Sequence, residues 1–494
     1  MKARIIRFCL IGVLTVIAQV AMAQRGCRPQ LIEKGVPEHA RAYHRAALSP
    51  SLANRTALFV RDSTYVGDRR QLTVLVSFAD RDFMGNEAET MAQWEKILNM
   101  EHYNEAPFHG SMHDYFYDQS YGQFRLAFDV HYVALSDSAK KYHSTSQDDD
   151  NSKYLVNDIL DSLVKRDIDW GAYDWNGNGY VNQLLIIYAG AGMHEGAPNS
   201  IWPHQWWLSQ HDNWQAYQVE YDKGKMMVDT YCCLPERTRD DTYGTFGTMC
   251  HEYSHCFGFP DFYYGNTIIV AGWDLMDYGN YNGDGFVPAG YSSFERAFMG
   301  WLNPTELGSD TIVTDMPALA DEPQAYLVRN EGHPDEYYLI ENRQPTNWDS
   351  GLPGSGITIF HVDYDERVFL IENPNNSWKQ RYSIFAANNM PYILAEGWGY
   401  PSSSGNNKLT NDSRPAATLN NLNADSTLLM SKPITNMVVT NGLAAFDFTS
   451  TITGISTSKA RHTPTGIRYN LSGQRVDDSY KGVVIENGKK RIIR

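Results

Sequence analysis

Cysteine is scarce in this chain, with 6 residues in 494. Cys9 lies in an N-terminal segment that we expect to be removed, and the other five are Cys27, Cys232, Cys233, Cys250 and Cys256. Five is an odd number and too small for a disulfide scaffold, so the fold has to depend on its hydrophobic core. The sequence leaves undecided whether a single disulfide joins the Cys232 and Cys233 pair to the Cys250 to Cys256 segment.

Positive charge is also in short supply. Lys and Arg total 42 against 58 for Asp and Glu, which gives a net charge of −16. A protein that coats DNA or RNA needs surplus cations opposite the phosphates, so we expect no nucleic acid partner. Hydrophobic residues make up 42% of the chain and charged residues 20%, which excludes a mainly disordered protein.

Long apolar runs are absent from the sequence, and no segment has the length of an ordinary transmembrane helix. The short apolar stretch at 8–18 follows three cations and precedes Ala21-Met22-Ala23, a small-x-small cleavage pattern. This order predicts a signal peptide at 1–23 and a secreted, extracellular protein, with attachment to the cell surface as a further option. An uncleaved membrane anchor is the alternative.

Four further segments follow the expected signal peptide. The first is polar and has little periodicity, as in a pro-segment or spacer. The second alternates strand and helix patterns, which predicts an α/β layer, and the third has strand patterns separated by Pro, Gly, Asn and Ser. The fourth is a Ser/Thr-rich linker with a basic end. The expected boundaries are 24–70, 71–305, 306–450 and 451–494.

Within the second segment, a strand is expected to begin at Leu72 and further strands at 124–130 and 184–190. Ser111 followed by Asp114 resembles a capping box that opens a short helix, with Gly122 where a helix stop belongs. Apolar residues at helical spacing predict an amphipathic helix from about Ser152 to Lys165.

The most informative stretch is CHEYSHCFGFPD, residues 250–261. On a helix, His251 and His255 leave the same face and can bind one metal ion. Glu252 sits beside the first ligand, within reach of a water on that ion. Gly258 can adopt a positive φ and turn the chain, which lets Asp261 supply a third ligand. Three protein ligands leave a position open for water, as in catalytic zinc sites.

Beyond Asp261 comes GWDLMDYGNYNGDG, whose Met276 lies fifteen residues after Asp261. With HExxHxxGxxD, this block resembles the metzincin-type zinc metallopeptidases, and in particular the immune inhibitor A family, which uses Asp as the third ligand. Further matching blocks include GSMHDYFYDQSYGQFRLAFDV and FERAFMGWLNP. The resemblance implies an α/β (α+β) metzincin-like catalytic domain with a twisted mixed sheet and an active-site helix, followed by a β-sandwich-like domain.

The resemblance also implies roles for single residues. Met276 would form the Met-turn, an apolar floor beneath the metal. Zn²⁺ would lower the pKa of its water, and Glu252 would take the proton as general base and return it to the departing amine. Tyr278 is a candidate for stabilising the oxyanion, with packing in the turn as its alternative role. These roles describe a zinc metalloendopeptidase that acts on protein or peptide substrates.

The stretch DWNGNGYVN resembles the start of an EF-hand loop, and the family resemblance suggests calcium there. Position twelve of the loop is Leu185 rather than Glu, so the match is incomplete, and a plain Asn-Gly turn is the alternative. The expected Ca²⁺ ligands are Asp174, Asn176, Asn178, Tyr180 (backbone carbonyl) and Asn182.

Other features leave alternatives open. His194, Glu195 and His204 are expected to lie at the surface beside the substrate cleft, with a second metal as the less favoured hypothesis. The basic C-terminus resembles sorting segments that export machinery recognises, or else forms a terminal hairpin. The alternative function is a surface glycan- or protein-binding protein with an inert zinc site.

Overall fold

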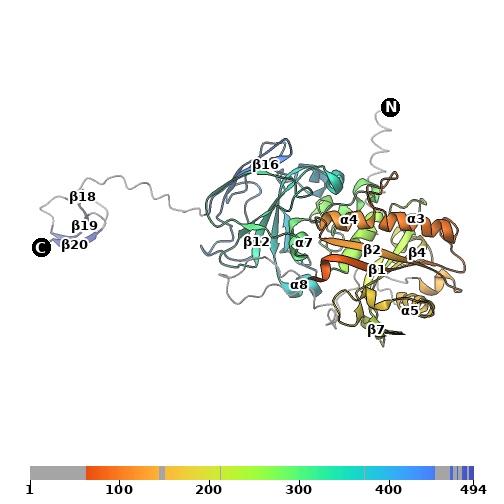
Figure 1. Ribbon diagram of the computed structural model, residues 1–494. Helices are drawn as coiled ribbons and strands as arrows, with labels where there is room; N and C mark the ends of the chain where they lie inside the picture. Colours follow the sequence, from red (N-terminus) through yellow and green to blue (C-terminus); the bar gives the residue numbers. More distant parts are fainter. Residues whose placement is uncertain are drawn as a thin grey trace, which may run out of the picture. The chain divides into compact units, whose positions relative to one another are not determined.

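The computed structural model describes residues 63–143, 151–211, 213–371 and 373–450, and the stretches 468–470, 475–476, 481–486 and 489–493. The chain forms two compact units, one that ends at Ser450 and one from Thr451 to Arg494 (Figure 1). The predicted signal peptide, Cys27 and most of the predicted pro-segment lie outside the described residues. Among those that are described, no helix combines the length and apolar character needed to cross a membrane.

A five-stranded mixed sheet forms the centre of the first unit, with the strand order β2-β1-β4-β8-β5. The first four of these strands are parallel to their neighbours, and β5 pairs antiparallel with β8 at one edge. Their bounds are β1 (Gly67–Ser77), β2 (Phe124–Ala134), β4 (Leu184–Ala191), β5 (His204–Trp207) and β8 (Thr230–Arg237).

The apolar run of β4 is explained by burial on both faces of this sheet. Leu185 and Ile187 contribute to one hydrophobic core, and Leu184 and Ile186 to the other. Because side chains alternate between the faces of a strand, a strand with a core on each side has to be apolar at successive positions.

Helices cover both faces of the sheet (Figure 1). Trp94 of α3 (Glu87–Asn99) and Tyr115 of α4 (Met112–Gln119) belong to one core, whereas the apolar side of α5 (Ser152–Leu163) belongs to the other. The predicted capping box at the start of α4 is confirmed, because Ser111 accepts the backbone N–H of Asp114 and Asp114 accepts that of Ser111.

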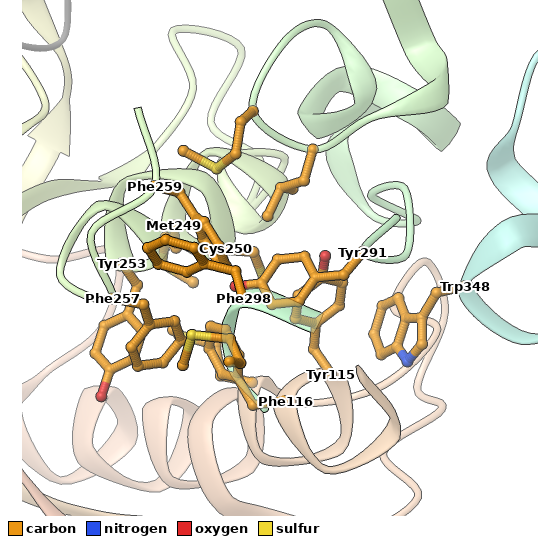
Figure 2. Close-up of a cluster of buried hydrophobic side chains, with 14 of the residues drawn as sticks. Tyr115, Phe116, Met249, Cys250, Tyr253, Phe257, Phe259, Tyr291, Phe298 and Trp348 are labelled. Atoms are coloured by element: carbon orange, nitrogen blue, oxygen red, sulfur yellow. The ribbon is translucent and has the colours of Figure 1, made fainter. Parts of the chain in front are cut away.

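The helix α6 (Phe246–His255) packs against α4. Figure 2 shows the cluster of buried hydrophobic side chains that the two helices share. The rings of Phe116 and Tyr253 lie 5.1 Å apart between their centroids. Tyr253 also donates a hydrogen bond of 2.7 Å from Oη to Gln71 Oε1 in β1. The helix with the predicted zinc ligands is therefore fixed to both the sheet and α4.

Two sheets with the orders β14-β13-β12-β11-β9 and β10-β16-β15 make up most of the β-rich region and share one hydrophobic core. Phe360 and Tyr382 instead join the core of α6 and α4. The bounds are β9 (Thr305–Glu306), β10 (Thr311–Met316), β11 (Tyr326–Arg329), β12 (Glu336–Arg343), β13 (Gly356–Asp363), β14 (Tyr382–Ile384), β15 (Ile434–Thr440) and β16 (Leu443–Phe448).

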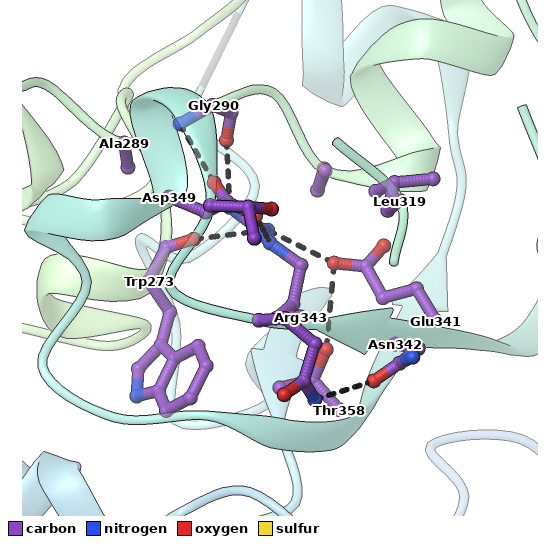
Figure 3. A network of polar contacts seen from close by, with 12 residues as sticks. Trp273, Ala289, Gly290, Leu319, Glu341, Asn342, Arg343, Asp349 and Thr358 are labelled. Carbon is purple, nitrogen blue, oxygen red and sulfur yellow. Dashed lines mark hydrogen bonds and ion pairs between the residues drawn. The ribbon is translucent and has the colours of Figure 1, made fainter. Parts of the chain in front are cut away.

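A buried network around Arg343 connects β12 to segments near α6 (Figure 3). Its guanidinium donates to both carboxylate oxygens of Asp349, at 2.6 and 2.8 Å, and to Glu341 Oε1 at 2.9 Å. It also donates to the carbonyl oxygens of Trp273 and Gly290, at 3.4 and 2.9 Å. The charged groups are thus paired, as burial of an arginine requires.

The remaining elements are short. The first unit also holds α7 (Ser293–Phe298), α8 (Glu366–Ile371) and a small sheet of β3 (Tyr180–Val181), β6 (Tyr217–Tyr221) and β7 (Gly224–Val228). The second unit holds a sheet of β17 (Arg468–Asn470), β18 (Arg475–Val476), β19 (Gly482–Glu486) and β20 (Lys489–Ile493).

Several boundaries differ from the expectations. The strand β1 begins at Gly67 rather than Leu72, so the last residues of the expected 24–70 segment belong to the sheet. The helix α5 ends at Leu163, and α3 was not predicted. The cysteine bridge that the sequence left open is not formed, since none of the four cysteines in the described part of the chain takes part in a disulfide.

Candidate metal centre

The predicted ligands lie where the HExxH spacing placed them. His251 and His255 occupy the last two turns of α6, and their ring centroids are 4.9 Å apart. After the helix ends, Gly258 adopts a φ of 95°, a conformation that favours glycine. The chain turns there and brings Asp261 back to the two imidazoles.

The three side chains converge on one point. Asp261 Oδ1 lies 3.2 Å from His251 Nε2 and 3.2 Å from His255 Nε2. The candidate ligand atoms of all three residues fall within 4.8 Å of one another, and no other such group of His, Cys, Asp or Glu occurs among the described residues. Ligands about 2.0–2.1 Å from a tetrahedral zinc ion are roughly 3.3 Å from each other, so this donor set fits zinc.

The other nitrogen of each ring fixes the tautomer. His251 Nδ1 lies 2.9 Å from the carbonyl oxygen of Leu275, and His255 Nδ1 lies 2.7 Å from that of Phe259. A carbonyl oxygen only accepts, so each Nδ1 carries the proton. Once Nε2 has lost its proton, its lone pair faces Asp261, as a metal ligand requires.

Charges inside the site favour a bound cation. Burial alone would lower the pKa of His251, but the hydrogen bond to Asp261 and the charges of Glu252 and Asp261 raise it to about 9. Burial would raise the pKa of Asp261, but His255 and His251 hold it well below its usual value. The same field that retains a proton on the imidazole also attracts a divalent cation, so the two compete for Nε2.

The predicted Met-turn contacts the ligand segments through its backbone. Met276 is fully buried, and its backbone N–H donates to Asp274 Oδ1 at 2.8 Å. Its carbonyl oxygen accepts the N–H of Phe262 at 2.8 Å, next to Asp261. The turn therefore contacts one ligand through Leu275 and the segment of another through Phe262.

The comparisons with known proteins agree with this geometry. Residues 60–303 match the profile of the immune inhibitor A peptidase M6, catalytic domain. This region of the chain belongs to the immune inhibitor A family. Since that is a family of metallopeptidases, the protein is a zinc metalloendopeptidase. A comparison with curated proteins gave no match.

In this M6 peptidase, Glu252 lies at a cavity beside the metal centre. The Glu252 side chain is buried, and its Oε2 lies 3.9 Å from His255 Nε2. The cavity has a volume of about 330 Å³, which includes the space at its mouth that is open to solvent. It is lined by Glu252, His194, Trp202, Pro203, Thr248, His251, Tyr263, Asp277, Asn280 and Tyr281.

Tyr278 is not among the residues that line this cavity. It packs against Tyr281 with a ring separation of 5.3 Å, and burial together with the charges of Tyr392 and Asp277 raises its pKa. Tyr281 and Tyr263 are the tyrosines at the cavity, and sequence reasoning named neither. The only signals in the sequence were their positions: Tyr263 lies two residues after Asp261, and Tyr281 lies three residues after Tyr278.

The expectation that His194 and His204 lie at the surface is wrong, because both are buried. His194 lines the cavity, and burial lowers its pKa to about 4. His204 Nδ1 lies 2.7 Å from the carbonyl oxygen of Trp202, and its Nε2 lies 3.3 Å from Tyr231 Oη. His194 is therefore a buried residue of the cavity wall, whereas His204 is buried at the start of β5.

The predicted calcium loop folds around the side chain of Asp174. Asp174 Oδ1 accepts the backbone N–H groups of Gly177 and Asn178, at 2.9 and 3.0 Å, and Oδ2 accepts that of Gly179 at 2.9 Å. Side-chain oxygens of the other ligand candidates also accept backbone N–H groups: Asn176 from Asn178, Asn178 from Tyr180, and Asn182 from Trp175. Calcium at this loop stays a prediction.

Proposed function

We propose that the peptidase cleaves peptide bonds of proteins with a water molecule that Glu252 activates, at a zinc ion held by His251, His255 and Asp261. The observation that carries the proposal is the convergence of the three ligand atoms beside the cavity that Glu252 lines. A zinc ion in this position would acidify the water and polarise the scissile carbonyl.

The residues of this chain have separate tasks in the proposal. Glu252 accepts the proton of the attacking water and returns it to the departing amine, a transfer worth about 10²–10⁴-fold in rate. The carbonyl oxygens of Leu275 and Phe259 keep the two imidazoles in the required tautomer. Tyr278 is retained as a candidate oxyanion donor, and comparison of Tyr278→Phe with Tyr281→Phe decides which tyrosine affects kcat.

The test of the proposed function is cleavage of casein by the purified protein before and after chelation. We expect cleavage to stop on removal of the metal and to return with added zinc. The alternative is a glycan- or protein-binding protein with an inert site. A zinc-loaded protein that leaves casein and denatured proteins uncut would favour that alternative.

We also propose export by the signal peptide at 1–23, with recognition of residues 451–494 by export machinery and release to the medium or attachment to the cell surface. Mass spectrometry of the exported protein would show a mature N-terminus after Ala23, and a chain that lacks 451–494 would stay in the cell.

Calcium at 174–182 is a further proposal, supported by the EF-hand-like order of oxygen donors. Titration with Ca²⁺ should give one binding event in the wild type and none in Asp174→Ala. Equal binding by both proteins would place calcium elsewhere.

A further inference from the structure

We propose that Asn373 and Asn375, which lie beyond the region matched by the family profile, are positioning residues that hold Asp261 in place for the metal. This inference rests on the proposed zinc ligation by Asp261. It assigns part of the metal centre to the β-rich region of the chain.

Together the two asparagines donate hydrogen bonds to three consecutive backbone carbonyl oxygens, those of residues 261–263. Asn373 Nδ2 donates to the carbonyl oxygens of Asp261 and Tyr263, at 2.9 and 2.8 Å. Asn375 Nδ2 donates to the carbonyl oxygen of Phe262 at 2.7 Å. We call Asn373, Asn375 and their three hydrogen bonds to residues 261–263 the asparagine clamp.

The clamp is itself tied to β14. Asn373 Oδ1 accepts the N–H of Asn375 at 2.8 Å, which sets the spacing of the two side chains. Asn375 Oδ1 accepts the N–H of Tyr382 at 3.0 Å, and Asn375 Nδ2 donates to the carbonyl oxygen of Tyr382 at 2.8 Å. Since Asn375 is 3% exposed, these bonds are shielded from competition with water.

Tyr382 extends the connection to the Met-turn. Its ring stacks on Phe262 with centroids 3.8 Å apart, and its hydroxyl donates to Asp274 Oδ2 at 2.7 Å. Asp274 in turn accepts the N–H of Met276. The residue after Asp261 is thus held on one side by the Met-turn and on the other by β14.

Such support matters because Asp261 lies in a loop. Residues 259–263 belong to neither a helix nor a strand, whereas His251 and His255 are fixed by α6. A loop ligand that is not held has to be ordered when the metal binds, which weakens binding, and a preorganised ligand avoids this loss. The clamp supplies the hydrogen bonds that secondary structure would otherwise provide.

The test compares zinc affinity and Co²⁺ spectra of the full chain for the wild type, Asn373→Asp and Asn406→Asp. Asn373→Asp keeps the shape and the Oδ1 acceptor but removes the N–H donors. Asn406 is a matched control, because its Nδ2 also donates to two carbonyl oxygens, Ala387 and Arg414, and its Oδ1 also accepts the N–H two residues on.

We expect Asn373→Asp to bind zinc about 10–100-fold more weakly, with an altered visible spectrum of the Co²⁺-substituted protein. Asn406→Asp should match the wild type in both. A negative charge added near a cation would by itself tighten binding, so weaker binding reports the lost donors. Unchanged affinity and spectrum in Asn373→Asp would overturn the proposal.

Three further outcomes are distinguishable. If the wild type itself holds no zinc, the proposed ligation fails rather than the clamp alone. If Asn373→Asp does not fold, Asn375→Asp is measured in its place, with the same expected loss. If neither variant folds while Asn406→Asp does, the bonds support the whole fold, and their assignment to the metal centre is overturned.

Discussion

His251 Nδ1 and the carbonyl oxygen of Leu275 lie 2.9 Å apart, which links the first proposed zinc ligand to the residue just before Met276. The Met-turn thus acts on the metal centre through its backbone, because the Leu275 carbonyl fixes the tautomer and orientation of the ring. The apolar Met276 side chain fills the core below.

Removal of one ligand should release the metal. We expect His255→Ala to retain less than about a tenth of the zinc of the wild type, because two ligands cannot complete the site. Elemental analysis of the purified protein is the measurement. His113→Ala is the matched control, since His113 Nδ1 also contacts a backbone carbonyl, that of Leu126 at 2.6 Å, and it should keep its zinc.

The buried His194 predicts a pH dependence of stability. Its pKa falls from 6.5 to about 4 on folding, so between these values the unfolded chain binds a proton that the folded chain does not. The stabilisation is complete above pH 6.5 and is lost as the pH falls toward 4, with a slope of about 1.4 kcal/mol per pH unit.

Urea unfolding at pH 7 and pH 5 tests this expectation. His194→Gln should lose less stability than the wild type between the two pH values, while the exposed His102→Gln should behave like the wild type. Equal losses in the wild type and His194→Gln would show that His194 is protonated in the folded protein.

Gly247 permits close packing of α6. A Cβ atom at this position would overlap the carbonyl oxygen of Asn280, in the segment that follows the Met-turn. Gly247→Ala should therefore destabilise the protein by about 3 kcal/mol, although alanine favours helices by about 1 kcal/mol over glycine. Thermal unfolding is the measurement, and Gly308→Ala, where a Cβ meets no atom within 4 Å, should unfold like the wild type.

The Arg343 network predicts a strong effect of losing one partner. Arg343→Met leaves the charges of Asp349 and Glu341 buried without their cation, which should lower the free energy of unfolding by about 3–5 kcal/mol. Denaturant unfolding provides the value. The exposed pair of Arg125 and Asp68 is the control, and Arg125→Met should change stability little. A similar small change in Arg343→Met would contradict the assigned role.

Short sequence patterns predicted those elements that depend on residues close together in the chain. The apolar run of β4 and the capping box of α4 are examples, and so is HExxH, because helical periodicity alone brings His251 and His255 to one face. The helix α3 had a comparable signal that was missed: Asn86 and Glu89 form a capping box. The start of β1 was placed too late because Gly67–Arg70 is polar and partly exposed.

Contacts between distant residues had no such signal. Asn373 and Asp261 are 112 residues apart, and nothing in either neighbourhood marks them as partners. The burial of His194 likewise depends on how its loop packs near Trp202, whose ring centroid lies 6.4 Å away. Sequence spacing can therefore identify ligands on one helix, whereas the groups that orient them require the fold.

The most direct test of the account is the rate of peptide cleavage by zinc-loaded Glu252→Gln, with zinc content measured on the same sample. We predict a rate at least about 100-fold below that of the wild type with the same amount of zinc bound, because glutamine cannot accept the proton of the water. Cleavage at the wild-type rate would contradict the role of Glu252 as the general base.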